Sequence, residues 1–228
     1  MFYSKMLNNL FNNVNWENPR RITDNIIDLY YKQSDCNFET NAKDMLSVLS
    51  SDNIFPLFVE TMNKLKCSIL YKSHIHGQSH IERVSILSFA LALQLQLNSH
   101  DLELCLEIAK YHDIGRRDEG EDEEHGMRGA EKFMAICDEF SNNDKNIIAM
   151  VIAAHSLRDD CYINLFKQWK GLEEAQYIRC KILLDIIKDA DALDRFRLRD
   201  KSLKIDFLRL GYSTELVRVA CEMVHAFD

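Results

Sequence analysis

Glycine and proline are scarce in this chain, which has only 7 glycines and 2 prolines among its 228 residues. A fold made of many short strands needs many tight turns, and those turns depend on these two residue types. Hydrophobic residues make up 46% of the chain, which is enough for one sizeable core. The composition therefore predicts an all-α fold around a single core.

The balance of charges limits the class of partner. The formal net charge is −8 at neutral pH. Proteins that bind long nucleic acids usually carry a basic surplus, because neutralising phosphates supplies much of their affinity. We therefore do not expect nucleic acid as a partner, although a local basic strip could hold a small phosphorylated ligand.

The cysteines and the apolar segments indicate the compartment. The chain has 7 cysteines, an odd number, and no Cys-x-x-Cys pair, which is typical of free thiols in a reducing environment. No segment is long and apolar enough for a signal sequence or a membrane span. We expect a cytoplasmic protein without a membrane partner.

Apolar residues recur at helical spacing along most of the chain. Before residue 73 the pattern predicts helices over residues 20–32, 41–50 and 54–71, and none of them carries a chemical signature. We therefore predict an N-terminal helical extension over residues 1–72 and a core over residues 73–228. Within the core, the pattern predicts helices that follow Gly77, Asn98 and Asp144 and helices over the ranges 127–140, 172–191, 202–210 and 213–227.

Ionisable residues stand where several of these apolar faces end. His112, His155 and Asp191 each follow apolar residues at helical spacing, so each is expected to point inward. A buried ionisable side chain is costly without a partner, and a single case is usually satisfied by an ordinary hydrogen bond. Several of them on different helices indicate a common partner. Imidazole and carboxylate groups together suit a divalent metal ion.

Three motifs in a fixed order strengthen this interpretation. They are H-x-x-R-V at His80, the doublet His112-Asp113 within Y-H-D-I-G, and A-D-x-L at Asp191. Over residues 73–200 the chain resembles the HD-domain metal-dependent phosphohydrolases. The resemblance implies an HD-domain helical bundle in which His80, His112, Asp113 and Asp191 bind a divalent ion. The metal identity stays open among Mn, Fe, Co, Ni, Zn and Mg.

Two further histidines bear on the number of metal ions. His125 lies in H-G-M-R-G-A and His155 in V-I-A-A-H-S, and both resemble positions at which dinuclear branches of the family bind a second metal. One metal ion is expected, and a second would be held by these two residues. The alternatives are a solvated loop histidine at position 125 and a helix-end histidine at position 155 bonded to a backbone carbonyl.

The resemblance also implies the reaction. A metal-activated water would cleave a phosphate ester or anhydride of a small molecule, with a nucleotide as the leading substrate. His112, Asp113 and Arg116 are the predicted catalytic residues, and Asp113 would orient or deprotonate the water. Cations are needed to hold the phosphate. The candidates, each of which could instead form a surface salt bridge, are Arg116, Arg117, Arg128 and either Arg195 or Arg197.

Other polar residues are given ordinary interpretations. His74 and His76 either line the pocket or lie in a solvated loop, and the solvated loop is preferred. The acidic run 119–124 is expected on a solvated face or as a gate between site histidines. Asp189 is either solvated or a partner that orients a ligand histidine. Asp191 is preferred to Asp189 as the metal ligand because the A-D-x-L motif of the family places the ligand there.

Three other classes of function stay open on the same sequence. They are an HD-fold di-iron oxygenase, an HD-type nuclease and a catalytically silent regulatory module. Bound iron with oxygen uptake would identify the first, a basic channel would favour the second, and the lack of a pocket would favour the third. A homodimer is also left open.

Overall fold

The computed structural model describes residues 5–17, 40–198 and 203–226. Within these residues the only regular elements are helices, so the predicted all-α class is confirmed. The helix expected over residues 20–32 lies outside the described residues. The α-helices are α1 Lys5–Asn12, α3 Ala42–Ser51, α4 Phe55–Asn63, α5 Gln78–Gln94, α6 Ser99–Tyr111, α7 His125–Ile136, α8 Asn142–His155, α9 Tyr162–Gln168, α10 Tyr177–Leu193 and α11 Val217–His225. The 3-10 turns are η1 Cys67–Ile69, η2 Asp159–Cys161, η3 Glu174–Gln176, η4 Asp194–Arg197, η5 Ile205–Phe207 and η6 Gly211–Leu216.

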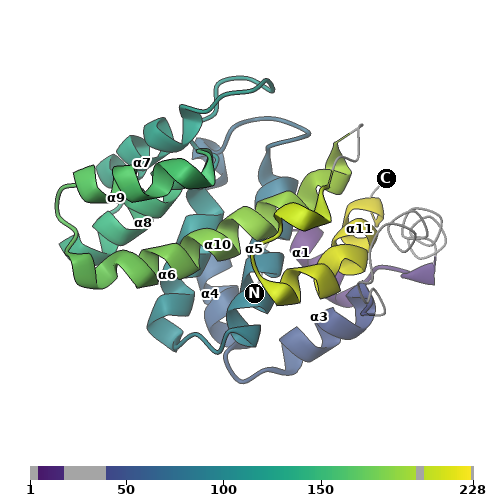
Figure 1. Ribbon diagram of the computed structural model, residues 1–228. Coiled ribbons are helices and arrows are strands. Elements are labelled where there is room, and N and C mark those ends of the chain that lie inside the picture. Colours follow the sequence, from purple (N-terminus) through teal and green to yellow (C-terminus); the bar gives the residue numbers. More distant parts are fainter. Residues whose placement is uncertain (1–4, 18–39, 199–202, 227–228) are drawn as a thin grey trace.

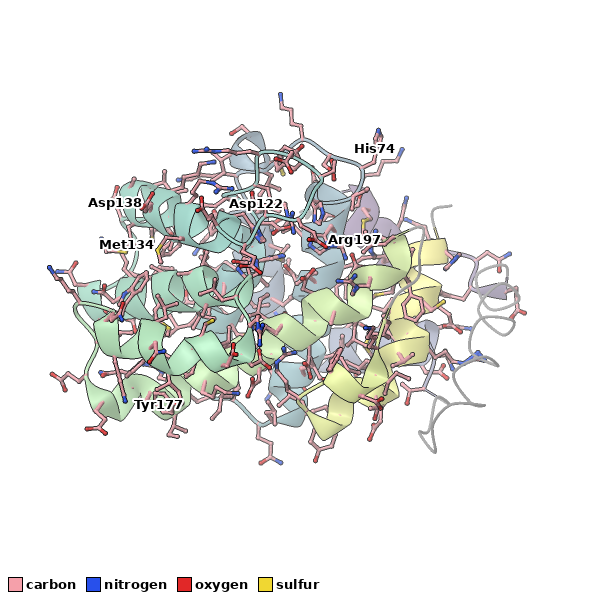
Figure 2. The ribbon with its side chains drawn as sticks, turned by 45° about the horizontal axis from the view of Figure 1, so that its top comes forward. His74, Asp122, Met134, Asp138, Tyr177 and Arg197 are labelled. Carbon is pink, nitrogen blue, oxygen red and sulfur yellow. The ribbon has the colours of Figure 1, made fainter. Side chains whose placement is uncertain are left out.

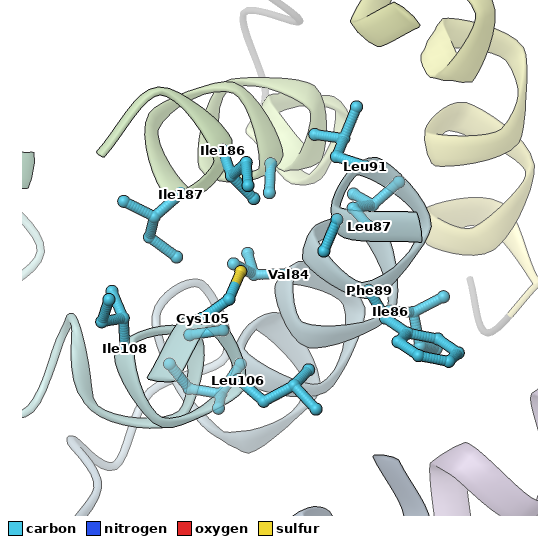
Figure 3. Packing of buried hydrophobic residues seen from close by; sticks show 14 of the residues in the cluster. Val84, Ile86, Leu87, Phe89, Leu91, Cys105, Leu106, Ile108, Ile186 and Ile187 are labelled. Atoms are coloured by element: carbon cyan, nitrogen blue, oxygen red, sulfur yellow. The ribbon is translucent and has the colours of Figure 1, made fainter. Parts of the chain in front are cut away.

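Helix α5 lies at the centre of the bundle. It packs on α6 and α10, and α8 packs on the same two helices. Every residue of α5 from His80 to Ala92 is buried, as expected for a helix enclosed on all sides. Figure 3 shows Val84 of α5 beside Cys105 of α6, with Ile187 of α10 facing them. In Figure 1, α7, α8 and α9 lie on one side of this centre, and α1, α3 and α11 lie on the other.

The N-terminal helices pack on the rest of the chain. Helix α4 lies against α6, while α3 contacts both α1 and α11. The Phe58 ring of α4 stacks on Phe89 of α5 with ring centroids 5.0 Å apart. The amide of Ala42 donates to the buried Glu222 carboxylate at 2.7 Å, which ties the start of α3 to α11. The division of the chain after residue 72 stays a prediction.

Three helices expected from the sequence are shorter than predicted, and one of them is the helix over residues 213–227, where the described α-helix is Val217–His225. The segment 54–71 is helical only to Asn63, and a short 3-10 turn, η1, follows. The segment 202–210 has only η5 among its described residues, because the amides of Arg209 and Leu210 donate to the Asp189 carboxylate rather than to a helix. A periodic pattern marks an inward face without marking where the backbone hydrogen bonds stop.

The ends of other helices also differ from the prediction. Helix α8 is capped by Ser141, whose hydroxyl accepts from the amide of Asp144, so Asp144 is not the cap. Helix α10 begins at Tyr177 instead of residue 172, because η3 occupies the preceding residues. Helix α7 begins and ends earlier than the predicted 127–140. By contrast, Asn98 caps α6 as predicted, with its side chain accepting from the Asp101 amide.

No helix in the described part of the chain combines the length and the apolar character that crossing a bilayer would require.

Candidate metal centre

The ends of five helices converge on one polar cluster inside the bundle. His80 lies in the first turn of α5, His112 directly follows α6, and His125 begins α7. His155 is the last residue of α8, and Asp191 lies near the end of α10. In Figure 2, Asp122 and Arg197 lie near each other, well apart from Tyr177 at the start of α10.

One group of donor atoms surrounds Nε2 of His80. This atom lies 3.1 Å from Nε2 of His112, 3.4 Å from Oδ1 of Asp191 and 3.5 Å from Oδ2 of Asp113. The His80 side chain is fully buried, whereas Asp191 is 36% exposed. Asp191 therefore lies on the side of the cluster that is open to solvent. The structure brings together the residues predicted to bind the first metal ion.

A second group adjoins the first through Asp113. Oδ1 of Asp113 lies 3.1 Å from Nε2 of His125 and 3.6 Å from Nε2 of His155, and these two nitrogens are 2.9 Å apart. The other oxygen of Asp113 faces His80. One carboxylate thus stands between two histidine pairs, which is the arrangement expected of two adjacent metal positions with a shared ligand.

The second nitrogen of each ring fixes its tautomer. Nδ1 of His112 lies 2.9 Å from the carbonyl of Ala109, and Nδ1 of His155 lies 2.6 Å from the carbonyl of Ile152. A carbonyl oxygen only accepts, so each Nδ1 carries the hydrogen. Nδ1 of His125 meets the carbonyl of Asp122 in the same way. The Nε2 atoms that face the cluster are therefore lone-pair donors to a cation.

The charges of the cluster support the same interpretation. Burial lowers the pKa of His112 to about 3 and also lowers the pKa of His155, so both rings are neutral near pH 7. Burial opposes ionisation of Asp113, but the charge interaction with His112 and the close approach of His125 and His155 hold its pKa well below the usual range. The pKa of Asp191 is likewise low, because Arg197 and His80 outweigh its burial.

These observations test whether the residues fit a metal ion. Neutral imidazole lone pairs and ionised carboxylates converge at hydrogen-bonding distance. The ring hydrogens of His112, His125 and His155 are on Nδ1 and face backbone carbonyls, so they do not lie between the converging atoms. Such a set of acceptors repels itself unless a cation lies within it. All of the donors are nitrogen or oxygen, which suits Zn, Mn, Fe, Co or Ni. The cluster fits a divalent metal centre.

Two buried partners at the cluster were not assigned a role from the sequence. Nδ1 of His80 lies 2.8 Å from Asp194, which also binds the Arg83 guanidinium at 2.5 and 3.0 Å. Burial opposes ionisation of Asp194, but Arg83 and His80 lower its pKa to about 2. His76, expected in a solvated loop, is only 7% exposed and places Nδ1 3.1 Å from Oδ2 of Asp113.

Asp189 has neither of the roles considered for it. Its carboxylate is fully buried, so it is not solvated. It accepts from the amides of Arg209 and Leu210 and from the hydroxyl of Ser213, and so it anchors the segment after η5. The residue that orients a ligand histidine from this region is Asp194, at the start of η4.

The predicted phosphate-binding arginines are placed in different settings. Nε of Arg116 lies 3.1 Å from both oxygens of Asp113, and Arg195 is exposed at the mouth of the site. Arg197 lies 3.4 Å from Asp191. Arg128 instead binds the carbonyl of Gly115 and the carboxylate of Asp122, which fastens the α6–α7 loop. Arg117 is exposed and is not among the described residues that line the cavities at the site.

Glycines within the motifs allow the helices to approach closely. Gly115 does not end a helix in the left-handed conformation, because α6 ends at Tyr111 and Gly171 is the only glycine of the described ranges with positive φ. A Cβ on Gly115 would instead lie 1.9 Å from the carbonyl oxygen of His125. A Cβ on Gly126 would lie 2.7 Å from the carbonyl of Ile152. These glycines let α7 bring His125 against His155.

Two cavities open from the cluster, and both are lined by His155, Asp191 and Arg195. The acidic cavity has a volume of about 500 Å³, and its wall includes Glu119, Glu121, Asp122 and Glu123. The basic cavity has a volume of about 470 Å³, and its wall includes Lys188, Lys204, Arg209 and the ring of Phe207. Each volume is within the range of small-molecule sites.

The fold and the cluster together define a helical protein with a buried His/Asp metal site. A family model described as the HD domain matches residues 77–195, more than half of the chain. The chain therefore belongs to the HD-domain family, a superfamily of metal-dependent hydrolases, as its sequence motifs predicted. Comparison with curated proteins and with solved structures gave no match.

Proposed function

We propose that this protein hydrolyses a phosphate ester or anhydride of a small molecule, with a nucleotide as the leading substrate. The observation that carries the proposal is the convergence of imidazole and carboxylate acceptors beside Arg195, at the point where two cavities meet. A metal ion held by such ligands would activate the water of such a reaction, and a neighbouring arginine supplies the positive charge that holds a phosphate.

The metal ion would be held by two overlapping sets of residues. His80, His112 and Asp191 form the first, and Asp113 joins it to the second, which is completed by His125 and His155. When bound there, a divalent ion lowers the pKa of its water toward ~7 and polarises a phosphoryl oxygen.

The residues of the chain supply the rest of the chemistry. Asp113 is ionised and only 4% exposed, so it can accept a proton from an attacking water without competition from bulk solvent. Arg116 holds both oxygens of that carboxylate and, through the carbonyl of Gly120, the following loop. Arg195 is placed to offset charge that develops on a phosphoryl group next to Asp191.

A screen with added metals tests the proposal. The full chain should turn over at least one small phosphoester in the presence of Mn, Co, Ni or Mg, and Asp113→Ala should not. Turnover of oligonucleotides alone would indicate a nuclease instead. Tightly bound iron with oxygen uptake and no phosphoester turnover would indicate the oxygenase chemistry that the same kind of ligand set can support.

A further inference from the structure

The two cavities that open from the metal centre carry opposite charge. The acidic cavity is lined by four carboxylates of one loop, between residues 119 and 123. Arg116, which also lines it, is already bound to Asp113. The basic cavity is lined by Lys188, Arg195, Lys204 and Arg209, with Asp191 as its acidic lining residue. A phosphorylated ligand that reaches the cluster is therefore repelled from one side and attracted to the other.

The cations of the basic cavity differ in how much of their charge is already offset. Lys188 and Arg209 both bind Asp159, at 2.6 and 2.9 Å. These contacts shape the wall of the cavity and reduce its net charge. Lys204 is exposed, and its Nζ lies 5.4 Å from the centroid of the Phe207 ring. Arg195 lines both cavities, as does Asp191.

The rim of the basic cavity carries an aromatic ring that is open to solvent. Phe207 is 67% exposed, the most exposed of the large hydrophobic residues in the described ranges. It belongs to the three-residue turn η5. The amides of Arg209 and Leu210, shortly after this turn, donate to the Asp189 carboxylate and so anchor it. Every nucleobase has a flat face that stacks on an aromatic side chain, and a neighbouring cation adds to the contact.

We propose that the substrate is a nucleotide that lies in the basic cavity, with its base stacked on Phe207 and its phosphate directed past Arg195 toward Asp191. The proposal rests on the proposed function for the direction of the phosphate. It makes Phe207 and Lys204 determinants of specificity that take no part in the chemistry. The acidic cavity does not hold the phosphorylated ligand.

Binding of two matched probes tests the base contact. Adenosine 5′-monophosphate and ribose 5-phosphate share a sugar phosphate and differ by the base. Their dissociation constants are measured by calorimetry on the metal-free full chain, and KM is measured with Mn²⁺ added. The wild type should bind the nucleotide at least ~10-fold more tightly, and Phe207→Ala should remove that preference. Phe207→Trp should keep it.

Controls separate the base contact from a general effect. Tyr212, which is 44% exposed and outside the lining of the basic cavity, gives the control variant Tyr212→Ala. Lys204→Glu should weaken binding of both probes. Lys43→Glu, which makes the same change of charge at an exposed position of α3, should not. Equal binding of the two probes by the wild type, or an unchanged preference in Phe207→Ala, would overturn the proposal.

The same measurements distinguish this proposal from the proposed function. If the metal-free chain prefers the nucleotide through Phe207 but no phosphoester is hydrolysed with any metal, the hydrolase proposal fails and the nucleotide site stands. If phosphoesters are hydrolysed but the base makes no difference to binding or KM, the nucleotide site fails and the hydrolase proposal stands.

Discussion

His80 and Asp194, 114 residues apart in sequence, are joined by a hydrogen bond of 2.8 Å inside the bundle. The carboxylate accepts from Nδ1, which leaves Nε2 of His80 free to bind a metal ion. Partners of this kind orient a ligand and raise its basicity, and their loss typically costs ~10–100-fold in metal affinity. We therefore predict that Asp194→Asn weakens metal binding by this factor, as measured by competition with a metal-sensitive dye.

Asp189→Asn is the matched control for that prediction. Asp189 and Asp194 are both fully buried, but Asp189 binds the segment after η5 rather than a histidine. The variant should lower the free energy of unfolding and leave the metal affinity of the folded protein unchanged. Equal losses of metal affinity in the two variants would mean that Asp194 acts only through stability.

Replacing Asp113 should remove both metal positions at once. Its two oxygens face different histidine pairs, and the carboxylate is 4% exposed. Asp113→Ala should therefore abolish metal binding and hydrolysis together, as measured by elemental analysis and a phosphoester assay. Asp138→Ala, on the exposed surface, is the control. Normal metal content in Asp113→Ala would show that the ligand assignment is wrong.

The second histidine pair determines the number of metal ions. His125 and His155 have their Nε2 atoms 2.9 Å apart and approach only one oxygen of Asp113. A variant with both changed to alanine should keep one ion at His80, His112 and Asp191 and lose any second ion. Titration calorimetry with Mn²⁺ measures the stoichiometry. An unchanged stoichiometry in a folded variant would remove this pair from the metal centre.

The close contact between α7 and α8 at Gly126 leaves no room for an added side chain. A Cβ on Gly126 would lie 2.6 Å from the Ser156 hydroxyl and 2.7 and 2.8 Å from two carbonyls of α8. Gly126→Ala should lower the free energy of unfolding by ~1–3 kcal/mol, because the helices must separate. Gly211→Ala, which would meet nothing within 4 Å, should change it by less than ~0.5 kcal/mol. Urea denaturation compares the two.

Asp159 should make a small contribution to stability that depends on pH. Burial opposes its ionisation, but Arg209 and Lys188 lower its pKa from 3.8 to about 2. An ionised group with a lowered pKa stabilises the fold above its unfolded pKa, and that stability is lost as the pH falls from about 4 toward 2. The side chain is 56% exposed, so the effect should stay under ~1 kcal/mol. The difference in unfolding free energy between wild type and Asp159→Asn should be smaller at pH 3 than at pH 6.

The sequence predicted the family and the convergence of the site histidines, because their motifs lie where apolar helical faces end. Spacing along one helix places His112 and His155 inward without reference to the rest of the fold. Asp194 was missed because its partners, His80 and Arg83, lie one turn apart on a distant helix. The spacing of that pair in H-x-x-R was the available signal, since one carboxylate can bind both.

The directions of some polar side chains near the site were predicted less well. His76 was expected in solvent because nothing in its neighbourhood shows that Asp113 covers it. Arg128 was considered for phosphate binding because it lies one turn after His125, yet its guanidinium binds Gly115 and Asp122. The direction of a long side chain is set by partners that are close only in the fold.

Metal analysis followed by a phosphoester screen on the full chain is the decisive experiment for metal-dependent hydrolysis by this protein. The purified protein is stripped with a chelator, and Mn, Co, Ni or Mg is added back before phosphomonoesters, nucleotides and phosphodiesters are supplied. We predict one or two bound ions per chain and turnover of at least one small phosphoester that disappears in Asp113→Ala. An intact metal site that turns over none of these compounds would contradict this prediction.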